Sequence, residues 1–509
     1  MTRLTAFVLG LGILAACAPP ASSQASDAEL RRAAATITPN DFYARIGFLA
    51  SDALQGRDTP SQGLEVAAAY IVSEFRSMGL EPAGENGTYF QRYPFVIREL
   101  VTEGTVFEAT APRARALTYG ADFYAGPATT APIRAELVYY HPGEGAADAR
   151  VRGKVVLVTD PLAAGRSRAD ERAFRPVRSA LLEAGAAALV VALPDDMGPA
   201  DVAARAAAST STRSTAAALP TFFVRAEPLR ELVRAAGGDL QALAARAPGA
   251  GPTPLGAVHL AAPYVDVDHQ PPNVAAMLPG SDPALRDTYV IFSAHMDHVG
   301  IGNPDESGDS IYNGADDDAS GTSAILEMAE AFAALPTPPR RSVIFMAVSG
   351  EEKGLLGSRY YADHPTLPLG QIVANVNMDM IGRNDPDSVV AIGQDLSSLG
   401  PLVQEVATRY ADDLRLTVAE DIWPDERFFF RSDHFSFAAK EIPALFFFTG
   451  VHEDYHRASD HVEKIDTDKA ARIAKLAFYF AHAIAADTER PAYTAEGLRQ
   501  VREAAGGRN

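Results

Sequence analysis

From residue 271 onward, short apolar runs alternate with amphipathic helical segments, and this alternation constrains the fold more than any other feature of the chain. The apolar runs have the length and composition of buried strands and cover residues 289–294, 341–349, 373–380 and 444–448. Residues 322–335 and 466–486 have the spacing of helices with one buried face. The pattern predicts an α/β fold, with a mixed, mostly parallel sheet sandwiched by helices.

A chain of 509 residues is too long for one compact domain, and its middle part differs in character. Residues 101–265 are rich in Ala, Gly and Pro and contain short β runs, without His, Asp and Glu at metal-ligand spacing. We expect this block to be an inserted, smaller, β-rich α/β domain without catalytic residues. The main domain would then comprise residues 39–100 and 266–488, followed by a polar, poorly ordered tail at 489–509.

The N-terminus has the pattern of an export signal. Arg3 precedes an apolar run that is too short to span a bilayer, and the run ends in Leu14-Ala15-Ala16-Cys17. This ending resembles the bacterial lipobox, in which the cysteine is lipidated and becomes the first residue of the mature protein. We expect a lipoprotein signal peptide over residues 1–16 and a flexible tether over 17–38; the alternative is an ordinary signal peptide with an incidental Cys17. The protein would be exported, as a periplasm-facing outer-membrane lipoprotein in a Gram-negative host and a cell-surface lipoprotein otherwise.

Composition excludes several classes of protein. Cys17 is the only cysteine, which excludes an internal disulfide framework, a cysteine zinc finger and an iron–sulfur cluster. The formal net charge of -20 repels phosphate, so we expect no nucleic-acid partner. Contact with a membrane is expected only through a lipid on Cys17.

Metal-ligating residue types follow the predicted strands, where open α/β sheets place their sites. They occur in the segments His295-Met296-Asp297-His298, Asp316-Asp317-Asp318, Glu351-Glu352, Asn377-Met378-Asp379 and Tyr455-His456 through Asp460. Imidazole and carboxylate without sulfur suit zinc or a related first-row ion. The ligands are numerous enough for two ions, and a pair about 3.5–4 Å apart can act together on one substrate carbonyl.

These segments, taken in order, resemble the bacterial leucyl-aminopeptidase-type family of co-catalytic di-zinc metallopeptidases, which also contains glutamate carboxypeptidases. The resemblance implies the zinc exopeptidase fold, which is phosphorylase/hydrolase-like. It also extends to Leu54-Gln55-Gly56-Arg57 near the N-terminus. Residues 153–158 and 219–224 of the inserted block look more loosely like a protease-associated domain.

The resemblance implies two zinc ions per chain with five ligands: His295 and Asp379 on one ion, Glu352 and His456 on the other, and Asp317 bridging them. Glu351 would be the general base that takes a proton from the water between the ions. Asp297 would orient His295, Asp460 could orient His456 in the same way, and the peptide bond between Asp317 and Asp318 would be cis. His298 and His434 could each line the site without binding metal.

The function expected from this resemblance is an exported exopeptidase, an aminopeptidase that hydrolyses N-terminal residues from a peptide substrate. A carboxypeptidase of the glutamate carboxypeptidase type is the first alternative, because Arg383, Arg427 and Arg431 could hold a substrate carboxylate. A single-zinc glutaminyl cyclase and a non-catalytic, receptor-like module are further alternatives. The complete ligand set argues against both of these.

Overall fold

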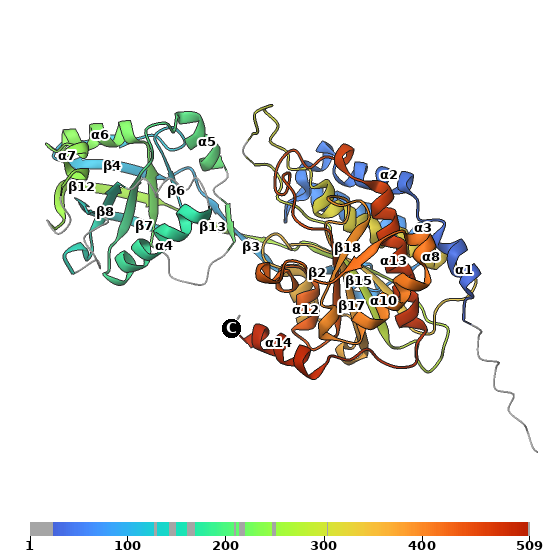
Figure 1. Ribbon diagram of the computed structural model, residues 1–509. Coiled ribbons are helices and arrows are strands. Elements are labelled where there is room, and N and C mark those ends of the chain that lie inside the picture. The colour runs from blue at the N-terminus through green and yellow to red at the C-terminus, as the bar shows by residue number, and fades with distance from the viewer. Residues whose placement is uncertain are drawn as a thin grey trace, which may run out of the picture. The chain divides into compact units, whose positions relative to one another are not determined.

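The computed structural model describes residues 24–126, 130–141, 149–159, 168–207, 210–212, 219–246, 251–302 and 304–506. The chain divides into two compact units (Figure 1). The first unit is built from the chain up to Tyr93 and again from Pro271, and the second unit is Pro94–Gln270. The predicted signal peptide and Cys17 lie outside the described residues, and no helix of the described part is long and apolar enough to cross a membrane.

The first unit contains a nine-stranded sheet in the order β1-β14-β16-β15-β17-β20-β18-β19, with β2 also paired to β14. Its centre is parallel: β15 (Tyr289–His295) lies between β16 (Ser342–Val348) and β17 (Ile372–Met378), and β17 pairs with β20 (Ala444–Phe448). The outer strands add the antiparallel pairs. These strands are β1 (Glu81–Pro82), β2 (Phe90–Arg92), β14 (Pro272–Leu278), β18 (Ser388–Ile392) and β19 (Thr417–Ala419).

Helices cover both faces of this sheet, and each central strand is therefore buried on both sides. Phe292 and Phe345 belong to a core shared with α2 (Pro39–Leu49), α3 (Gln62–Ser77), α8 (Gly321–Ala333), α10 (Leu399–Arg409) and α13 (Thr467–Ala486). Their neighbours Ile291 and Ile344 point to the opposite face and pack with α9 (Leu356–Asp363) and α12 (His434–Ala438). The short helix α11 (Ala411–Leu414) contributes Leu414 to the first core. The predicted α/β fold with a mixed sheet between helices is confirmed.

Two segments predicted to be poorly ordered are helical, and those predictions are wrong for the helical part. The tether predicted over 17–38 contains α1 (Asp27–Ala34), whose first turn is closed by a reciprocal capping box between Ser26 and Glu29 and whose Leu30 is buried. The tail predicted at 489–509 contains α14 (Ala495–Gly506), with Val501 only 1 % exposed. Both helices carry several charged residues and bury few residues, so composition alone hides them.

The second unit has a core of its own around Phe107, Phe123 and Phe222. Its eight-stranded sheet has the order β5-β4-β12-β7-β8-β9-β11-β6, and a smaller sheet has the order β10-β3-β13. The strands are β3 (Phe95–Leu100), β4 (Val106–Ala111), β5 (Arg115–Leu117), β6 (Phe123–Ala125), β7 (Thr130–Tyr139), β8 (Val155–Thr159), β9 (Ala188–Ala192), β10 (Thr210–Thr212), β11 (Thr221–Val224), β12 (Thr253–Ala262) and β13 (Tyr264–His269). The helices are α4 (Arg168–Glu183), α5 (Pro199–Ala207), α6 (Ala226–Ala235) and α7 (Leu240–Ala244).

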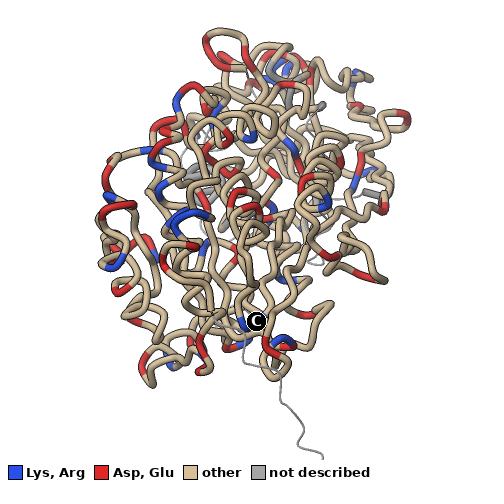
Figure 2. The backbone as a smooth tube through the Cα atoms, turned by 90° about the vertical axis from the view of Figure 1, so that its right-hand side faces the viewer, with Lys and Arg blue, Asp and Glu red and all other residues tan. Residues whose placement is uncertain are grey.

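The second unit is longer at both ends than the predicted insert of residues 101–265. The reason is the antiparallel pairing of β3, where the chain enters the second unit, with β13, where the chain leaves it. In this ladder Leu100 pairs with Tyr264 at one end and Phe95 pairs with His269 at the other. Figure 2 shows how the charged residues are distributed along the chain. The 65 Asp and Glu residues outnumber the 45 Lys and Arg residues, which gives the chain its net negative charge.

Candidate active site

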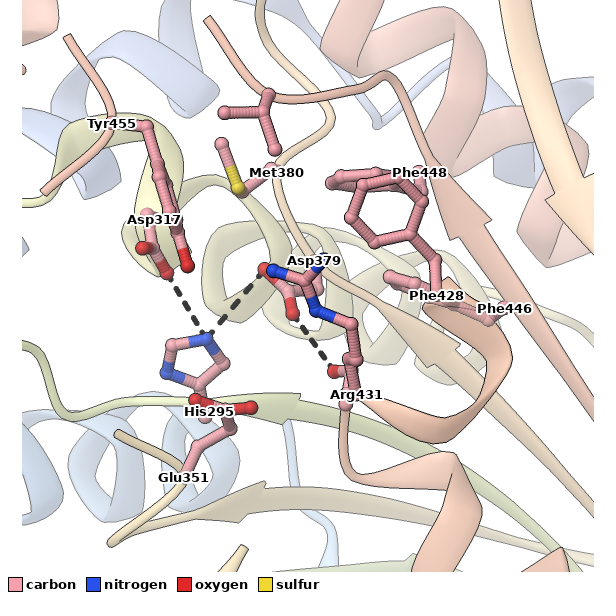
Figure 3. A pocket seen from close by; sticks show the side chains of 12 residues that line it. His295, Asp317, Glu351, Asp379, Met380, Phe428, Arg431, Phe446, Phe448 and Tyr455 are labelled. Carbon is pink, nitrogen blue, oxygen red and sulfur yellow. Dashed lines mark hydrogen bonds and ion pairs between the residues drawn. The ribbon is translucent and has the colours of Figure 1, made fainter. Parts of the chain in front are cut away.

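The site lies at the carboxyl ends of the parallel strands of the first unit. His295 is the last residue of β15, Asp379 follows β17 directly, and Glu351 and Glu352 come three and four residues after β16. Because the parallel strands end at the same edge of the sheet, these side chains are brought together. Figure 3 shows His295, Asp317, Glu351 and Asp379 converging on one pocket.

Two groups of metal-ligating atoms meet at Asp317. One group consists of His295, Asp317 and Asp379, and the other of His298, Asp317, Glu352 and His456; within each group the atoms lie within 4.8 Å of one another. Asp317 directs one carboxylate oxygen toward each group: its Oδ1 is 3.2 Å from His295 Nε2, and its Oδ2 is 3.1 Å from His456 Nε2. The structure thus brings together all five predicted ligands, and it adds His298, for which the sequence left open whether it lines the site or binds metal.

The other two residues of the aspartate triplet accept hydrogen bonds from backbone N–H groups. Asp316 accepts the N–H of Gly382 at 2.6 Å, and Asp318 accepts the N–H of His295 at 3.1 Å. Asp317 is therefore the member of the triplet that faces the candidate ligands. The peptide bond between Asp317 and Asp318 is cis, as the resemblance implied.

The donor atoms of the site fit a bound cation. Several buried atoms make no hydrogen bond with the described part of the chain, namely Asp379 Oδ1, Glu352 Oε1, His456 Nε2 and both ring nitrogens of His298. An unpaired buried polar group costs about 1–3 kcal/mol, so a cluster of them around common points is unfavourable without a ligand. A set of imidazoles and carboxylates without sulfur matches the preference of zinc.

Asp379 is held by a chain of buried polar side chains. Its Oδ2 accepts a hydrogen bond from Ser432 Oγ at 2.8 Å, and Ser432 Oγ accepts one from Asn377 Nδ2 at 2.9 Å. Asn377 Oδ1 in turn accepts from Ser293 Oγ at 2.6 Å. This series of hydrogen bonds leaves Asp379 Oδ1 directed toward His295 Nε2 at 3.5 Å, which is the orientation a metal ligand needs. The sequence left the role of Ser432 open, because a single serine carries no signature of such a role.

Asp297 connects His295 to the loop that carries Glu351. Its backbone carbonyl lies 3.1 Å from His295 Nδ1, whereas its carboxylate Oδ1 is 3.7 Å from that nitrogen. The carboxylate accepts the N–H of Glu351 at 3.3 Å and the hydroxyl of Thr59 at 3.0 Å. Asp297 therefore orients His295 mainly through its main chain and positions Glu351 through its side chain.

Asp460 has a different role from the orientation of His456 that the sequence suggested. Its carboxylate accepts the N–H of Asp316 at 3.0 Å and of Asp317 at 3.2 Å. It therefore fixes the backbone of the aspartate triplet, and the hydrogen bonds of the described residues do not join it to His456. The bonded N–H groups precede the cis peptide, so Asp460 holds the segment from which Asp317 projects.

Glu351 lines the pocket with its carboxyl group. Burial raises the pKa of Glu351 well above its usual range; the charge of His295 opposes this shift, and the carboxylates of Asp433, Glu352 and Asp379 add to it. Burial also raises the pKa of Asp433, to about 7. A carboxyl group with a raised pKa beside metal ligands is suited to take up and release a proton near neutral pH.

The pocket is small and has one polar and one apolar wall (Figure 3). It encloses about 50 Å³ between the candidate ligands and an apolar wall of Met380, Phe428, Phe446, Phe448 and Val451, and Tyr455 and Arg431 also line it. His434 lies in neither metal-ligand group: its ring stacks on Phe446 with the centroids 4.7 Å apart, and burial lowers its pKa to about 3.

Arg57 holds the loops of the site through hydrogen bonds to their backbone, in a role that the sequence did not reveal. Its side chain is fully buried and donates to the carbonyl oxygens of Met296 at 2.9 Å, Asn313 at 2.7 Å and Gly314 at 3.0 Å. The guanidinium group thus ties the segment after His295 to the segment before Asp317. Burial lowers the pKa of Arg57 to about 10.

Comparison with known proteins shows that the part of the chain carrying the site is similar to one peptidase family. Residues 273–481 match the model of Peptidase family M28. The matched residues include both metal-ligand groups and Glu351. The match covers less than half of the chain, and it agrees with the predicted class of zinc-dependent metallopeptidase.

Individual relatives are similar over part of the chain. A probable leucine aminopeptidase of Arthroderma benhamiae is 28 % identical over 233 residues, which cover 43 % of this chain and 59 % of the relative. Aminopeptidase YwaD of Bacillus subtilis is 30 % identical over 173 residues, covering 32 % of this chain and 36 % of the relative. The match thus spans less than two thirds of the length of these relatives.

Solved structures are similar over most of the chain. An aminopeptidase from Aneurinibacillus sp. strain AM-1 has a TM-score of 0.55 at 19 % identity, covering 91 % of this chain and 97 % of its own. The zinc aminopeptidase BSAP of Bacillus subtilis has a TM-score of 0.56 at 18 % identity, covering 88 % and 95 %. These likenesses show a shared fold.

Proposed function

We propose that this chain is an exopeptidase that binds two zinc ions and removes N-terminal residues from peptides. The observation that carries the proposal is the pair of metal-ligand groups that share Asp317, next to Glu351 in the same pocket. His295 and Asp379 would hold one ion and Glu352 and His456 the other, with Asp317 between them. The aminopeptidases among the similar proteins support the same class of reaction.

Zinc ions in such sites act as Lewis acids on carbonyl oxygens and lower the pKa of water. Glu351 would take a proton from the attacking water on its carboxylate and pass it to the nitrogen of the leaving amine. Its pKa is raised by burial and by neighbouring carboxylates, and nearby cations would lower the pKa toward neutrality. Asp297 would keep Glu351 in place through the hydrogen bond to the Glu351 N–H.

The lining of the pocket favours an N-terminal substrate. The carboxyl oxygens of Asp317, Glu351 and Asp379 give one wall hydrogen-bond acceptors, to which the ammonium group of a peptide can donate. The opposite wall carries the rings of Phe428, Phe446 and Phe448, which would receive an apolar side chain. We therefore propose that peptides with an apolar first residue are preferred.

A carboxypeptidase remains the second candidate because of Arg431, which lines the pocket and could bind a carboxylate. The other two arginines considered for this role are not among the residues that line the pocket. Arg383 pairs with Asp454 at 2.9 Å, and the Arg427 guanidinium lies 4.9 Å from the centre of the Phe430 ring. The lining contains three carboxyl groups that can accept hydrogen bonds and a single arginine, which favours the aminopeptidase.

A panel of peptides tests the direction of cleavage. Free-amine aminoacyl substrates should be cleaved, and N-blocked peptides with a free C-terminus should not; the reverse result would establish the carboxypeptidase. Glu351→Gln should lower kcat by about 10²- to 10⁴-fold while the zinc content stays unchanged. Glu405→Gln, at an exposed residue of α10, is the matched control, and near-normal activity of Glu351→Gln would show that another group moves the proton.

We also propose that the protein is exported, that Cys17 carries a lipid, and that the second unit is a protease-associated-like insert. The sequence before and around Cys17 supports the first two parts, and the interruption of the first unit between Tyr93 and Pro271 supports the third. Cys17→Ser should move the protein from the membrane fraction to the soluble fraction. An unchanged distribution of this variant would overturn the lipid anchor.

A further inference from the structure

We propose that His298 is an additional zinc ligand, so that the group around Glu352 holds its ion with two imidazoles and two carboxylates. The inference rests on the proposed function, because it assumes that zinc binds at both groups. It goes further by assigning a sixth ligand. It also makes the two metal positions unequal.

The position of His298 parallels that of His456. His298 Nδ1 lies 3.0 Å from Glu352 Oε1 and 3.7 Å from Asp317 Oδ2, and His456 Nε2 lies 3.0 Å and 3.1 Å from the same two oxygens. The two rings stand at 72° with their centroids 5.6 Å apart. Two imidazole nitrogens therefore approach one pair of carboxylate oxygens from different sides, as ligands around a common ion do.

Hydrogen bonding does not account for this approach. His298 is fully buried, and neither ring nitrogen makes a hydrogen bond with any residue that the structure describes. Glu352 Oε1 and His456 Nε2 are also without hydrogen-bond partners. Close nitrogen and oxygen atoms without hydrogen bonds between them fit a cation that accepts electron pairs from all of them.

The backbone around His298 holds the ring in place. Gly314 has a positive φ of 60°, and a Cβ atom at this position would lie 2.5 Å from His298 Cγ. Glycine is therefore required where the ring of His298 packs against the chain before Asp317. The backbone N–H of His298 donates a hydrogen bond to the backbone carbonyl of Arg57 at 3.3 Å.

A sixth ligand makes the two groups different in kind. The group of His295 offers three protein ligands, which leaves a fourth position open in a tetrahedral site. The group of His298 offers four, which can complete a tetrahedron. We expect the His298 group to keep its zinc more tightly, and the His295 group to be the position that exchanges its ion first.

X-ray absorption at the zinc edge, on the full chain loaded with two equivalents of zinc, counts the imidazoles directly. Three imidazoles on two ions predict about 1.5 per zinc, whereas His295 and His456 alone predict about 1.0. His298→Gln should reduce the wild-type value to about 1.0 and weaken the tighter of the two zinc affinities at least tenfold, as measured by chelator competition. His298→Asp, which restores a ligand, should recover much of that affinity.

His482→Gln is the matched control, because His482 is a buried histidine of α13 that lies outside both metal-ligand groups. It should leave the imidazole count and both affinities unchanged. A wild-type protein with two zinc ions, about 1.0 imidazole per zinc and no loss of affinity in His298→Gln would overturn the inference and leave the proposed function intact. A wild-type protein that retains fewer than two zinc ions would overturn both.

Discussion

Replacing Ser432 by alanine removes a hydroxyl group that lines the pocket and holds a candidate zinc ligand. Ser432 Oγ donates to Asp379 Oδ2 at 2.8 Å and accepts from Asn377 Nδ2 at 2.9 Å. The variant therefore loses both bonds at once. Asp379 becomes free to turn, and the amide donor of Asn377 is left buried without this partner.

The size of the effect follows from these two losses. Loss of a hydrogen-bond partner of a metal ligand lowers metal affinity by about 10- to 100-fold, which is about 1.4–2.8 kcal/mol. Only the ion held by Asp379 should be affected, since the other group has no bond to Ser432. The unpaired Asn377 donor should lower the free energy of unfolding by a further amount, about 1–3 kcal/mol.

The assay is a competition titration with a zinc chelator, which resolves one weakened and one unchanged site. Ser436→Ala is the matched control: its hydroxyl pairs with Ser358 Oγ at 2.9 Å, and Ser436 belongs to neither metal-ligand group. Equal zinc affinities for wild type, Ser432→Ala and Ser436→Ala would refute the reasoning. So would weakening of both sites to the same degree.

Three further predictions concern stability. Arg45 pairs with the fully buried Glu327, so Arg45→Met should leave an uncompensated buried carboxylate and lower the free energy of unfolding by about 3–5 kcal/mol, measured by urea denaturation. Burial lowers the pKa of His482 from 6.5 to about 4, with Arg409 adding to the shift and Asp27 opposing it. The unfolded chain then binds more protons between these values, so stability should rise with pH from about 4 to 6.5, and His482→Gln should flatten that rise in denaturation curves. Removing zinc with a chelator leaves the buried carboxylates of the site uncompensated, and it should lower Tm reversibly in differential scanning fluorimetry; an unchanged Tm would contradict a bound ion.

Some of the fold could be predicted because its strands are buried on both faces. The run 444–448 coincides with β20, and 289–294 differs from β15 by one residue, since neither strand contains a polar residue before its end apart from Ser293. β14 was missed because it begins at Pro272, directly after Pro271, and two consecutive prolines suggest a boundary rather than a strand. α14 was missed because few of its residues, such as Val501, are buried.

The candidate ligands could be predicted because the resemblance rests on short segments that carry them. The residues that support these ligands could not, since their roles depend on contacts between distant parts of the chain. Arg57 reaches carbonyl groups next to His295 and Asp317, and Ser432 reaches Asp379 from another segment. For His298, the sequence shows a histidine near a predicted ligand, and only the structure shows its nitrogen beside Glu352.

The central claim is that two zinc ions bound around Asp317 enable removal of N-terminal residues. The most direct test is to measure zinc per chain by mass spectrometry while zinc is added back to metal-free protein, and to follow the cleavage of a free-amine aminoacyl substrate in the same samples. Activity should rise to its maximum as the content reaches two zinc ions per chain. Full activity at one ion, or none at two, would contradict the account.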